Sequence, residues 1–119
     1  MDILIVDDDE RITSMLQEIL ESDDHRTRTA RDVNEGYLAY LGFKPELVIT
    51  DIQMSGKTGF ELIKNIRTHN TKIKAIYMSG DPDQFTSLLE QEEKVYNTAF
   101  LKKPFSMDKL KDMIVEDIA

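Results

Sequence analysis

Four short apolar runs limit the fold of this chain more than any other feature of its sequence. They are ILIV at 3–6, LVIT at 47–50, AIYM at 75–78 and TAFL at 98–101. Apolar runs of this length are typical of strands that are buried on both faces, as in a parallel sheet. The more polar stretch at 25–30 contains Thr27, Thr29 and Ala30, so we expect a fifth, weaker strand there, at an edge of the sheet.

Helical patterns separate these runs, with apolar residues at the spacing i, i+3, i+4, i+7 that gives a helix one apolar face. The first face is formed by Ile12, Met15, Leu16, Ile19 and Leu20. The third helix is expected to bury Leu62, Ile63 and Ile66, and the last helix Leu110, Ile114 and Ile118. Five strand–helix pairs in strict alternation imply right-handed βαβ units. We therefore predict an α/β fold in which helices cover both faces of one parallel sheet.

Polar residues predict where several of these helices begin and end. Asp32 and Thr58 each stand three residues before a glutamate, as in a capping box, and Ser106 is expected to cap the last helix. Asp81-Pro82 matches an N-cap followed by a proline in the first helical position. The second helix is expected to end at Gly42, because glycine is favoured just after a helix.

Composition narrows the possible functions. The 119 residues are enough for one domain, 1–119. A net charge of -8 disfavours direct binding of nucleic acid, whose backbone is also negative. The absence of cysteine excludes disulfides and thiolate metal sites. No apolar run is long enough to cross a membrane and no signal peptide is evident, so we expect a cytoplasmic protein without membrane contact.

Polar side chains follow four of the five predicted strands. Asp7 and Asp8 follow the first, Asp51 the third, Ser79 the fourth and Lys103 the fifth. Each has an ordinary structural explanation as a turn or cap residue. Those explanations do not predict that all of them lie at one sheet edge, which is where ligands bind in open parallel sheets.

Three carboxylates at one edge repel one another, so a cation such as Mg²⁺ is expected among them. With the ammonium group of Lys103, the occupied site would be nearly neutral and would suit a phosphoryl group, to which a hydroxyl can also donate. Asp51 is the best candidate for a nucleophile that forms an aspartyl phosphate, because it ends the most hydrophobic inner strand.

Four segments carry a resemblance to a known family. ILIVDDDE (3–10), LVITDIQM (47–54), YMSGD (77–81) and FLKKPF (100–105), in this order and spacing, resemble the receiver domain of two-component response regulators, including chemotaxis regulators. The resemblance covers the whole chain. It implies a flavodoxin-like (βα)5 fold with strand order 2-1-3-4-5. It also implies that a histidine kinase or a histidine phosphotransfer protein supplies a phosphoryl group to Asp51, with a downstream protein or fused output domain as the second partner.

The resemblance also assigns roles around a Mg²⁺ (or Mn²⁺) ion. Asp8 would bind the ion directly and Asp7 mainly through water. Asp51 would be both a ligand and the phosphoacceptor. Gln53, two residues later, would contribute its main-chain carbonyl.

Other matching positions concern the phosphoryl group and the output. Ser79 matches the hydroxyl that contacts the phosphoryl group, and Lys103 matches the family lysine, with a cis peptide bond expected before Pro104. Phe100 matches the aromatic switch position, and Gly59 matches the glycine before the third helix. The implied protein is a phosphorylation-controlled switch, and an enzyme only in catalysing its own phosphorylation and dephosphorylation.

The sequence departs from the family pattern at two places. Ser55 stands where proline is usual, so φ is not fixed there. Residues 94–97 (KVYN) replace a stretch of small residues before the last strand. In addition, Phe100 has no hydroxyl, so a switch there would have to act through ring packing.

Alternative functions fit less well. A haloacid dehalogenase-type phosphatase would need a second aspartate at the position of Gln53. A flavin-binding module would need a phosphate-binding loop after the first strand, where carboxylates stand instead. A degenerate docking module would not need all five site residues. A phosphorelay intermediate without conformational output remains an alternative to the switch.

Overall fold

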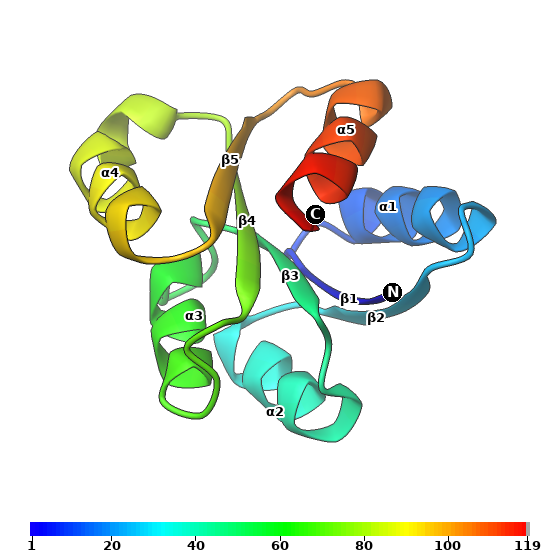
Figure 1. Cartoon of the computed structure of the whole chain (residues 1–119), viewed down its shortest axis with the longest axis horizontal. Helices are drawn as coiled ribbons and strands as arrows, with labels where there is room; N and C mark the ends of the chain where they lie inside the picture. The colour runs from blue at the N-terminus through cyan, green and yellow to red at the C-terminus, as the bar shows by residue number, and fades with distance from the viewer. Residues whose placement is uncertain (119) are drawn as a thin grey trace.

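Five parallel strands form one sheet with the order β2-β1-β3-β4-β5, and helices cover both of its faces (Figure 1). The computed structural model describes residues 1–118, without the side chains of Pro82 and of residues 116–118. The predicted α/β fold and the strand order implied by the resemblance are both confirmed. The elements in chain order are β1 (Asp2–Val6), α1 (Glu10–Ser22), β2 (Arg26–Ala30), α2 (Val33–Phe43), β3 (Leu47–Asp51), α3 (Gly59–Arg67), β4 (Lys74–Ser79), a 3-10 turn η1 (Pro82–Phe85), α4 (Thr86–Val95), β5 (Thr98–Lys102) and α5 (Met107–Ile118).

Alternate residues of the inner strands supply two separate cores. In β1, Ile3 and Ile5 face the layer of α1 and α5, whereas Leu4 and Val6 face the layer of α2, α3 and α4. The same alternation along β3 and β4 explains why these strands are apolar at nearly every position. Figure 1 shows the two helical layers on opposite sides of the sheet.

The helices begin largely where their polar residues predicted. The carboxylate of Asp32 accepts from the backbone N–H of Glu35 at 2.7 Å, and the hydroxyl of Thr58 accepts from that of Glu61 at 3.4 Å. The hydroxyl of Ser106 accepts from the backbone N–H three residues later at 3.2 Å. These bonds satisfy N–H groups that have no partner inside a helix.

The predicted start of the fourth helix was wrong. Residues Pro82–Phe85 form a 3-10 turn, and α4 begins only at Thr86. Asp81 makes no side-chain cap bond, and its backbone N–H donates instead to the hydroxyl of Ser79 at 3.0 Å. The backbone of Asp81 has φ -132° and ψ 77°, and its carboxylate accepts no N–H of the turn that follows.

Two smaller predictions also failed. α2 continues through Gly42 and ends at Phe43, and its C-cap residue Lys44 adopts the left-handed conformation with φ 50° and donates its N–H to the carbonyl of Tyr40. Met15, placed on the buried face of α1, is 41% exposed, whereas Leu16 and Leu20 of the same helix are fully buried. The side chain of Ile118 lies outside the described residues.

Within residues 1–118, none of the helices has the length and apolar character needed to cross a membrane.

Candidate functional site

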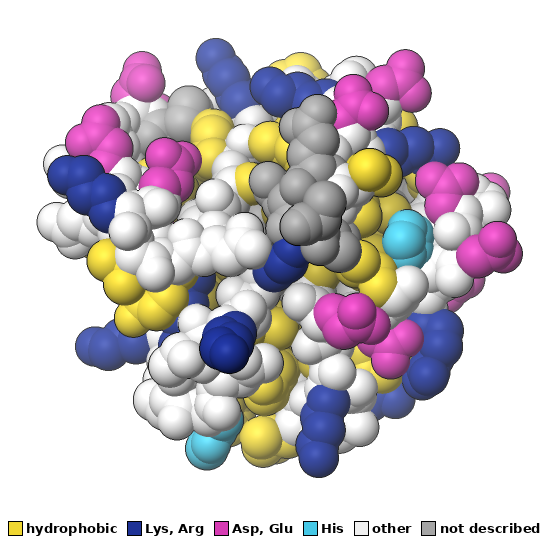
Figure 2. All heavy atoms as spheres, in the orientation of Figure 1, with side chains coloured by type: hydrophobic (Ala, Val, Ile, Leu, Met, Phe, Trp, Pro, Cys, Tyr) yellow, Lys and Arg dark blue, Asp and Glu magenta, His cyan; other side chains and the backbone are white. Residues whose placement is uncertain are grey.

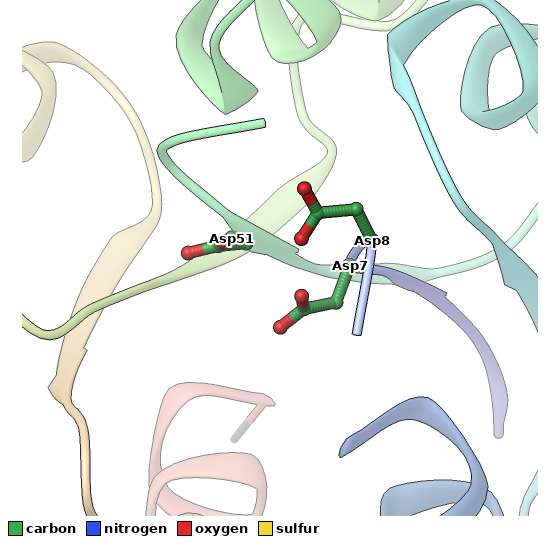
Figure 3. A group of neighbouring side chains, drawn as sticks. All are labelled: Asp7, Asp8 and Asp51. Atoms are coloured by element: carbon green, nitrogen blue, oxygen red, sulfur yellow. The ribbon is translucent and has the colours of Figure 1, made fainter. Parts of the chain in front are cut away.

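The residues expected at the strand ends do lie together, at the carboxyl edge of the sheet. Asp7 and Asp8 follow β1, Asp51 is the last residue of β3, and Ser79 is the last residue of β4. Lys103 directly follows β5. Figure 3 shows the Asp7 and Asp8 side chains leaving the end of β1 next to the Asp51 side chain at the end of β3. The order β1-β3-β4-β5 makes these four strand ends consecutive neighbours.

Asp7 is buried, with 1% of its surface exposed, and both of its carboxylate oxygens are engaged. Oδ1 accepts from the backbone N–H of Asp9 at 3.0 Å, and Oδ2 accepts from the ammonium group of Lys103 at 2.8 Å. A buried carboxylate needs such partners, since burying it unpaired is costly. Asp7 is therefore fixed in orientation, while Asp8 beside it is exposed.

Asp51 is 8% exposed. Two other carboxylates, those of Asp7 and Asp8, lie near it, but among the described residues only one ammonium group, that of Lys103. Burial and the neighbouring charge of Asp7 raise the pKa of Asp51 from its ordinary value of 3.8 to about 6, although Lys103 opposes the shift. The Lys103 ammonium lies 3.5 Å from Oδ1 of Asp51, a longer contact than its bond to Asp7. Asp51 is thus the carboxylate of this site with the weaker hold on the lysine.

Lys103 is held at both its backbone and its side chain. Its backbone N–H donates to the carbonyl of Ser79 at 2.8 Å, and its peptide bond to Pro104 is cis, as the resemblance predicted. Burial lowers the pKa of the Lys103 ammonium, but its contacts with Asp7 and Asp51 outweigh that effect and raise the pKa overall. Lys103 is therefore positively charged at neutral pH.

The acidic cluster suits a divalent cation. One carboxylate oxygen from each of Asp7, Asp8 and Asp51 lies within 4.8 Å of the other two. Oxygen ligands of this kind are those preferred by Mg²⁺ and Mn²⁺. The single ammonium group nearby leaves a deficit of positive charge, which a divalent ion would correct. Gln53 lies in the following loop, where it forms an isolated bridge with Thr58.

Ser79 lies at the end of β4 and Phe100 within β5. Ser79 is 2% exposed, and its hydroxyl oxygen accepts from the N–H of Asp81. Phe100 is paired across strands with Tyr77 and packs, partly buried, against the core under α2, α3 and α4. The hydroxyl at the site and the aromatic ring therefore belong to two adjacent strands.

Three contacts around Asp51 and Gln53 were not predicted from the sequence. A Cβ atom placed on Gly59 would lie 2.4 Å from the carbonyl oxygen of Asp51. The hydroxyl of Thr50 donates to that same carbonyl at 2.9 Å, and the side-chain amide of Gln53 donates to that of Gln84 at 3.1 Å. A glycine directly after the cap residue Thr58 was a usable signal for the first contact. No local pattern could have indicated the third, which joins residues 31 apart.

The fold and the site together define a class of protein, a doubly wound α/β domain with an acidic cluster and a lysine at the carboxyl edge of its sheet. A family model for the response regulator receiver domain matches residues 3–115. The chain belongs to this family, as its sequence motifs suggested.

Individual proteins agree with this assignment. The chain is 32% identical over 111 residues to the nitrogen assimilation regulatory protein NtrX of Azorhizobium caulinodans, covering 92% of this chain and 24% of NtrX. It is 25% identical to the sporulation initiation phosphotransferase F of Bacillus subtilis, covering 94% of this chain and 89% of that protein. Its structure is similar to that of a two-component response regulator from Clostridium difficile, with a TM-score of 0.85, 25% identity and coverage of 99% and 95%.

The chain spans about a quarter of NtrX and 45% of another relative, the transcriptional regulatory protein RprY of Bacteroides fragilis. Its likeness to these proteins therefore concerns one part of each of them.

Proposed function

We propose that this receiver domain, residues 1–119, accepts a phosphoryl group on Asp51. The observation that carries the proposal is the buried cluster of Asp7, Asp51 and Lys103, with Asp8 at its rim. A carboxylate oxygen of Asp51 attacks the phosphorus atom of a phosphohistidine. The bond from phosphorus to the histidine nitrogen breaks, and the nitrogen keeps the electron pair. The product is a mixed anhydride on Asp51.

The other groups of the site would bind the metal ion and contact the phosphoryl group. Asp7, Asp8, Asp51 and the main-chain carbonyl of Gln53 would hold Mg²⁺ or Mn²⁺, which offsets phosphoryl charge when bound. The ammonium group of Lys103, already 3.5 Å from Asp51, adds a fixed positive charge near the incoming oxygens. The hydroxyl of Ser79 would turn from its present partner to donate to a phosphoryl oxygen. Asp51 must be ionised to react, and with a pKa of about 6 it is so at neutral pH.

The test uses acetyl phosphate or a phosphorylated histidine kinase as donor, with Mg²⁺ present. Intact-mass measurement should show the addition of one phosphoryl group, and borohydride reduction followed by peptide mapping should place it at Asp51. Addition of EDTA should abolish the reaction while circular dichroism stays unchanged. A phosphoryl group mapped to another residue would contradict the proposal, as would equal labelling in EDTA.

The proposed partners follow from the family and from the charge. A histidine kinase or histidine phosphotransfer protein would supply the phosphoryl group in the cytoplasm, and a downstream protein or fused output domain would respond to it. Acidic side chains gather over α4, including Glu90 and Glu93 (Figure 2), and the net charge is -8. Both features disfavour nucleic acid as a direct partner of this domain. No membrane contact is proposed.

Output is proposed to pass through β4 and β5. Movement of the Ser79 hydroxyl toward a phosphoryl group draws the end of β4 inward, and the Phe100 ring turns into the space beside β5. The test is backbone NMR with beryllofluoride, a phosphoryl mimic. Resonances from Ser79 to Phe100 are expected to shift together with those of the Asp51 loop.

A second candidate, a phosphorelay intermediate that only carries the phosphoryl group, is favoured by the likeness over most of its length to the sporulation initiation phosphotransferase. In that case beryllofluoride should shift only the resonances around Asp51, leaving Phe100 unchanged.

A further inference from the structure

The outer side of α2 is apolar, although this helix lies on the surface of the domain. No residue from Gly36 to Phe43 is charged. Leu38 is 68% exposed, and Leu41, one turn later, is 44% exposed. Figure 1 shows α2 at the periphery of the domain, beside α3. A helix on the surface ordinarily has polar residues on its outer side, whereas a helix that is apolar all round is ordinarily buried. The sequence of α2 is therefore typical of a helix that is covered on both sides.

The inner side of α2 has no room for these leucines. It is formed by Val33, Gly36 and Tyr40, which are the buried residues of the helix. Gly36 packs so closely on α3 that a Cβ atom placed on it would lie 3.1 Å from Cδ2 of Leu62. A rotation of α2 that buried Leu38 would bring a larger side chain into this position. The two leucines therefore remain outside the core of the free domain.

A basic residue flanks the leucines on the β2 side of the helix. The guanidinium carbon of Arg28 lies 5.0 Å from the ring centre of Phe43, at the end of α2. Its Nη1 atom would be 3.4 Å from a Cβ atom placed on Gly42, which is exposed on the outer side of α2. Two other arginines nearby, Arg26 and Arg31, each pair with a carboxylate, whereas Arg28 forms no ion pair within the described part of the chain.

A second basic residue flanks the leucines on the α3 side. Lys44, the C-cap residue of α2, borders a groove of about 430 Å³ between the ends of α2 and α3. Leu41 borders the same groove from α2, and His69 borders it from the turn after α3. Among residues 1–118, none that borders the groove is acidic, and Lys44 forms no ion pair. Figure 2 shows hydrophobic and basic side chains together over α2, at the bottom of the view.

We define the α2 face as Leu38, Leu41 and Gly42 with the flanking Arg28 and Lys44. It is an apolar stripe between two positive charges, in a chain whose net charge is -8. A second copy of this chain is a poor occupant, because a symmetric contact would bring two positively charged faces together. An anionic membrane is also a poor occupant, because the rest of the domain is strongly negative. A protein segment that combines apolar and acidic residues matches both features of the face.

We propose that the α2 face binds an acidic amphipathic helix of a partner protein. The apolar side chains of that helix cover Leu38 and Leu41 and enter the groove, and its carboxylates pair with Arg28 and Lys44. The groove lies where α2 leads into the amino end of β3, whereas the acidic cluster lies at the carboxyl ends of the strands. The two sites are therefore at opposite edges of the sheet, and this proposal does not depend on phosphoryl transfer.

The first experiment asks whether the leucines serve the fold of the free domain. Leu38→Gln and Leu41→Gln should each leave the midpoint of thermal unfolding within about 3 °C of the unmodified protein. Both side chains are exposed, and glutamine is nearly as good a helix former as leucine. A fall of more than about 8 °C in either variant would show that the leucine supports the fold itself, and would contradict the proposal.

The second experiment titrates the protein with two synthetic helical peptides of about 18 residues, followed by NMR of the backbone amides. Both peptides carry leucines at the spacing i, i+3, i+4, i+7, flanked by glutamates in one peptide and by lysines in the other. The glutamate peptide should shift the amides of α2 and Arg28 with a Kd at least about tenfold lower than that of the lysine peptide. Equal binding of the two peptides would overturn the proposal, as would no binding of either.

Substitutions on the face provide the controls for this titration. Leu38→Gln with Leu41→Gln should weaken binding of the glutamate peptide about tenfold or more. Val115→Gln is the matched control, because it removes a side chain that is 71% exposed from α5, in the opposite helical layer. Binding that is equally strong in the leucine variant and in this control would place the peptide elsewhere on the domain.

Reversal of the two charges tests the choice of an acidic partner. Arg28→Glu with Lys44→Glu should bind the lysine peptide more tightly than the glutamate peptide. An unchanged preference for glutamate would show that these charges do not select the partner. If the double variant does not fold, Arg28→Gln and Lys44→Gln should each weaken binding of the glutamate peptide about threefold, and unchanged affinity in both would have the same meaning.

The other occupants are tested on the same protein. Sedimentation velocity should show a monomer, and the protein should not float with phosphatidylglycerol vesicles. A dimer that Leu38→Gln dissociates would assign the face to a second copy, and flotation that Leu38→Gln abolishes would assign it to a membrane. Either result would overturn the proposal. None of these measurements uses a phosphoryl donor, so failure of the proposed function would leave their outcome unaffected.

Discussion

Asp51→Asn should abolish phosphoryl uptake and, in the same molecule, make the metal-free domain more stable by about 1–2 kcal/mol at pH 7, because solvent screens part of the charge of Asp51. Phosphoryl uptake is lost because an amide cannot act as the nucleophile. Stability increases because the surroundings of Asp51 disfavour its ionised form. Burial and Asp7 raise its pKa from 3.8 to about 6, so the folded state binds this proton more tightly than the unfolded chain does.

The sign of the pH dependence separates this explanation from a general packing effect. Below pH 3.8 the carboxyl is protonated in both states, and the substitution should change the free energy of unfolding little. As the pH rises from 3.8 to about 6, ionisation increasingly opposes folding, so the advantage of asparagine grows and is complete above that range. Urea unfolding followed by far-ultraviolet circular dichroism suits the measurement, because the chain has no tryptophan.

Mg²⁺ gives a control for the same experiment. It should stabilise the unmodified protein and leave Asp51→Asn less affected, because the substitution removes one charged ligand from the cluster. An Asp51→Asn variant that is less stable than the unmodified protein at every pH would contradict the electrostatic explanation.

Gly59→Ala should destabilise the domain by about 3 kcal/mol, although alanine is the better helix former. The added Cβ would lie 2.4 Å from the carbonyl oxygen of Asp51 and 3.0 Å from two side-chain atoms of Thr50. A backbone carbonyl in a strand cannot move aside as the end of a flexible side chain can. The start of α3 would therefore have to move away from the end of β3. Chemical unfolding measures the loss, and NMR should show the largest shifts in the loop from Asp51 to Gly59.

Gly80→Ala provides the comparison. A Cβ atom at Gly80 would meet nothing within 4 Å, and its φ is not in the positive range. Its free energy of unfolding should stay within about 0.5 kcal/mol of the original. Equal effects of the two substitutions would show that close approach to Asp51 is not what excludes a side chain at Gly59.

The sequence predicted the sheet well because burial on both faces leaves a strong and simple pattern. The apolar runs gave β1, β3, β4 and β5 within one or two residues. The strand ends in turn identified the acidic cluster, since parallel strands bring their carboxyl ends to one edge. The roles assigned to Asp7, Asp8, Gln53, Ser79, Lys103 and Phe100 came from resemblance and remain predictions.

The errors concern segments whose conformation depends on distant partners. Asp81 has the residue type of a helix cap, but its side chain makes no cap bond and the residues that follow it form a 3-10 turn. The buried ion pair between Arg67 at the end of α3 and Glu92 in α4 was also not foreseen, because both are ordinary surface residue types when read locally. Only the packing of α3, β4, α4 and β5 places these two charges inside the protein. Propensity and periodicity report local preference and do not report contacts between residues far apart in the chain.

The ion pair between Asp7 and Lys103 joins residues 96 positions apart, and it has a consequence for synthesis of the protein. A chain leaving the ribosome exposes Asp7 early, and β1 can pair with β2 and β3 long before β5 exists. Until Lys103 arrives, the carboxylates of Asp7 and Asp51 lie at the sheet edge without their counter-charge. A domain that lacks β5 therefore lacks the Lys103 ammonium group that offsets part of this negative charge, and the cluster is complete only when the last strand is in place.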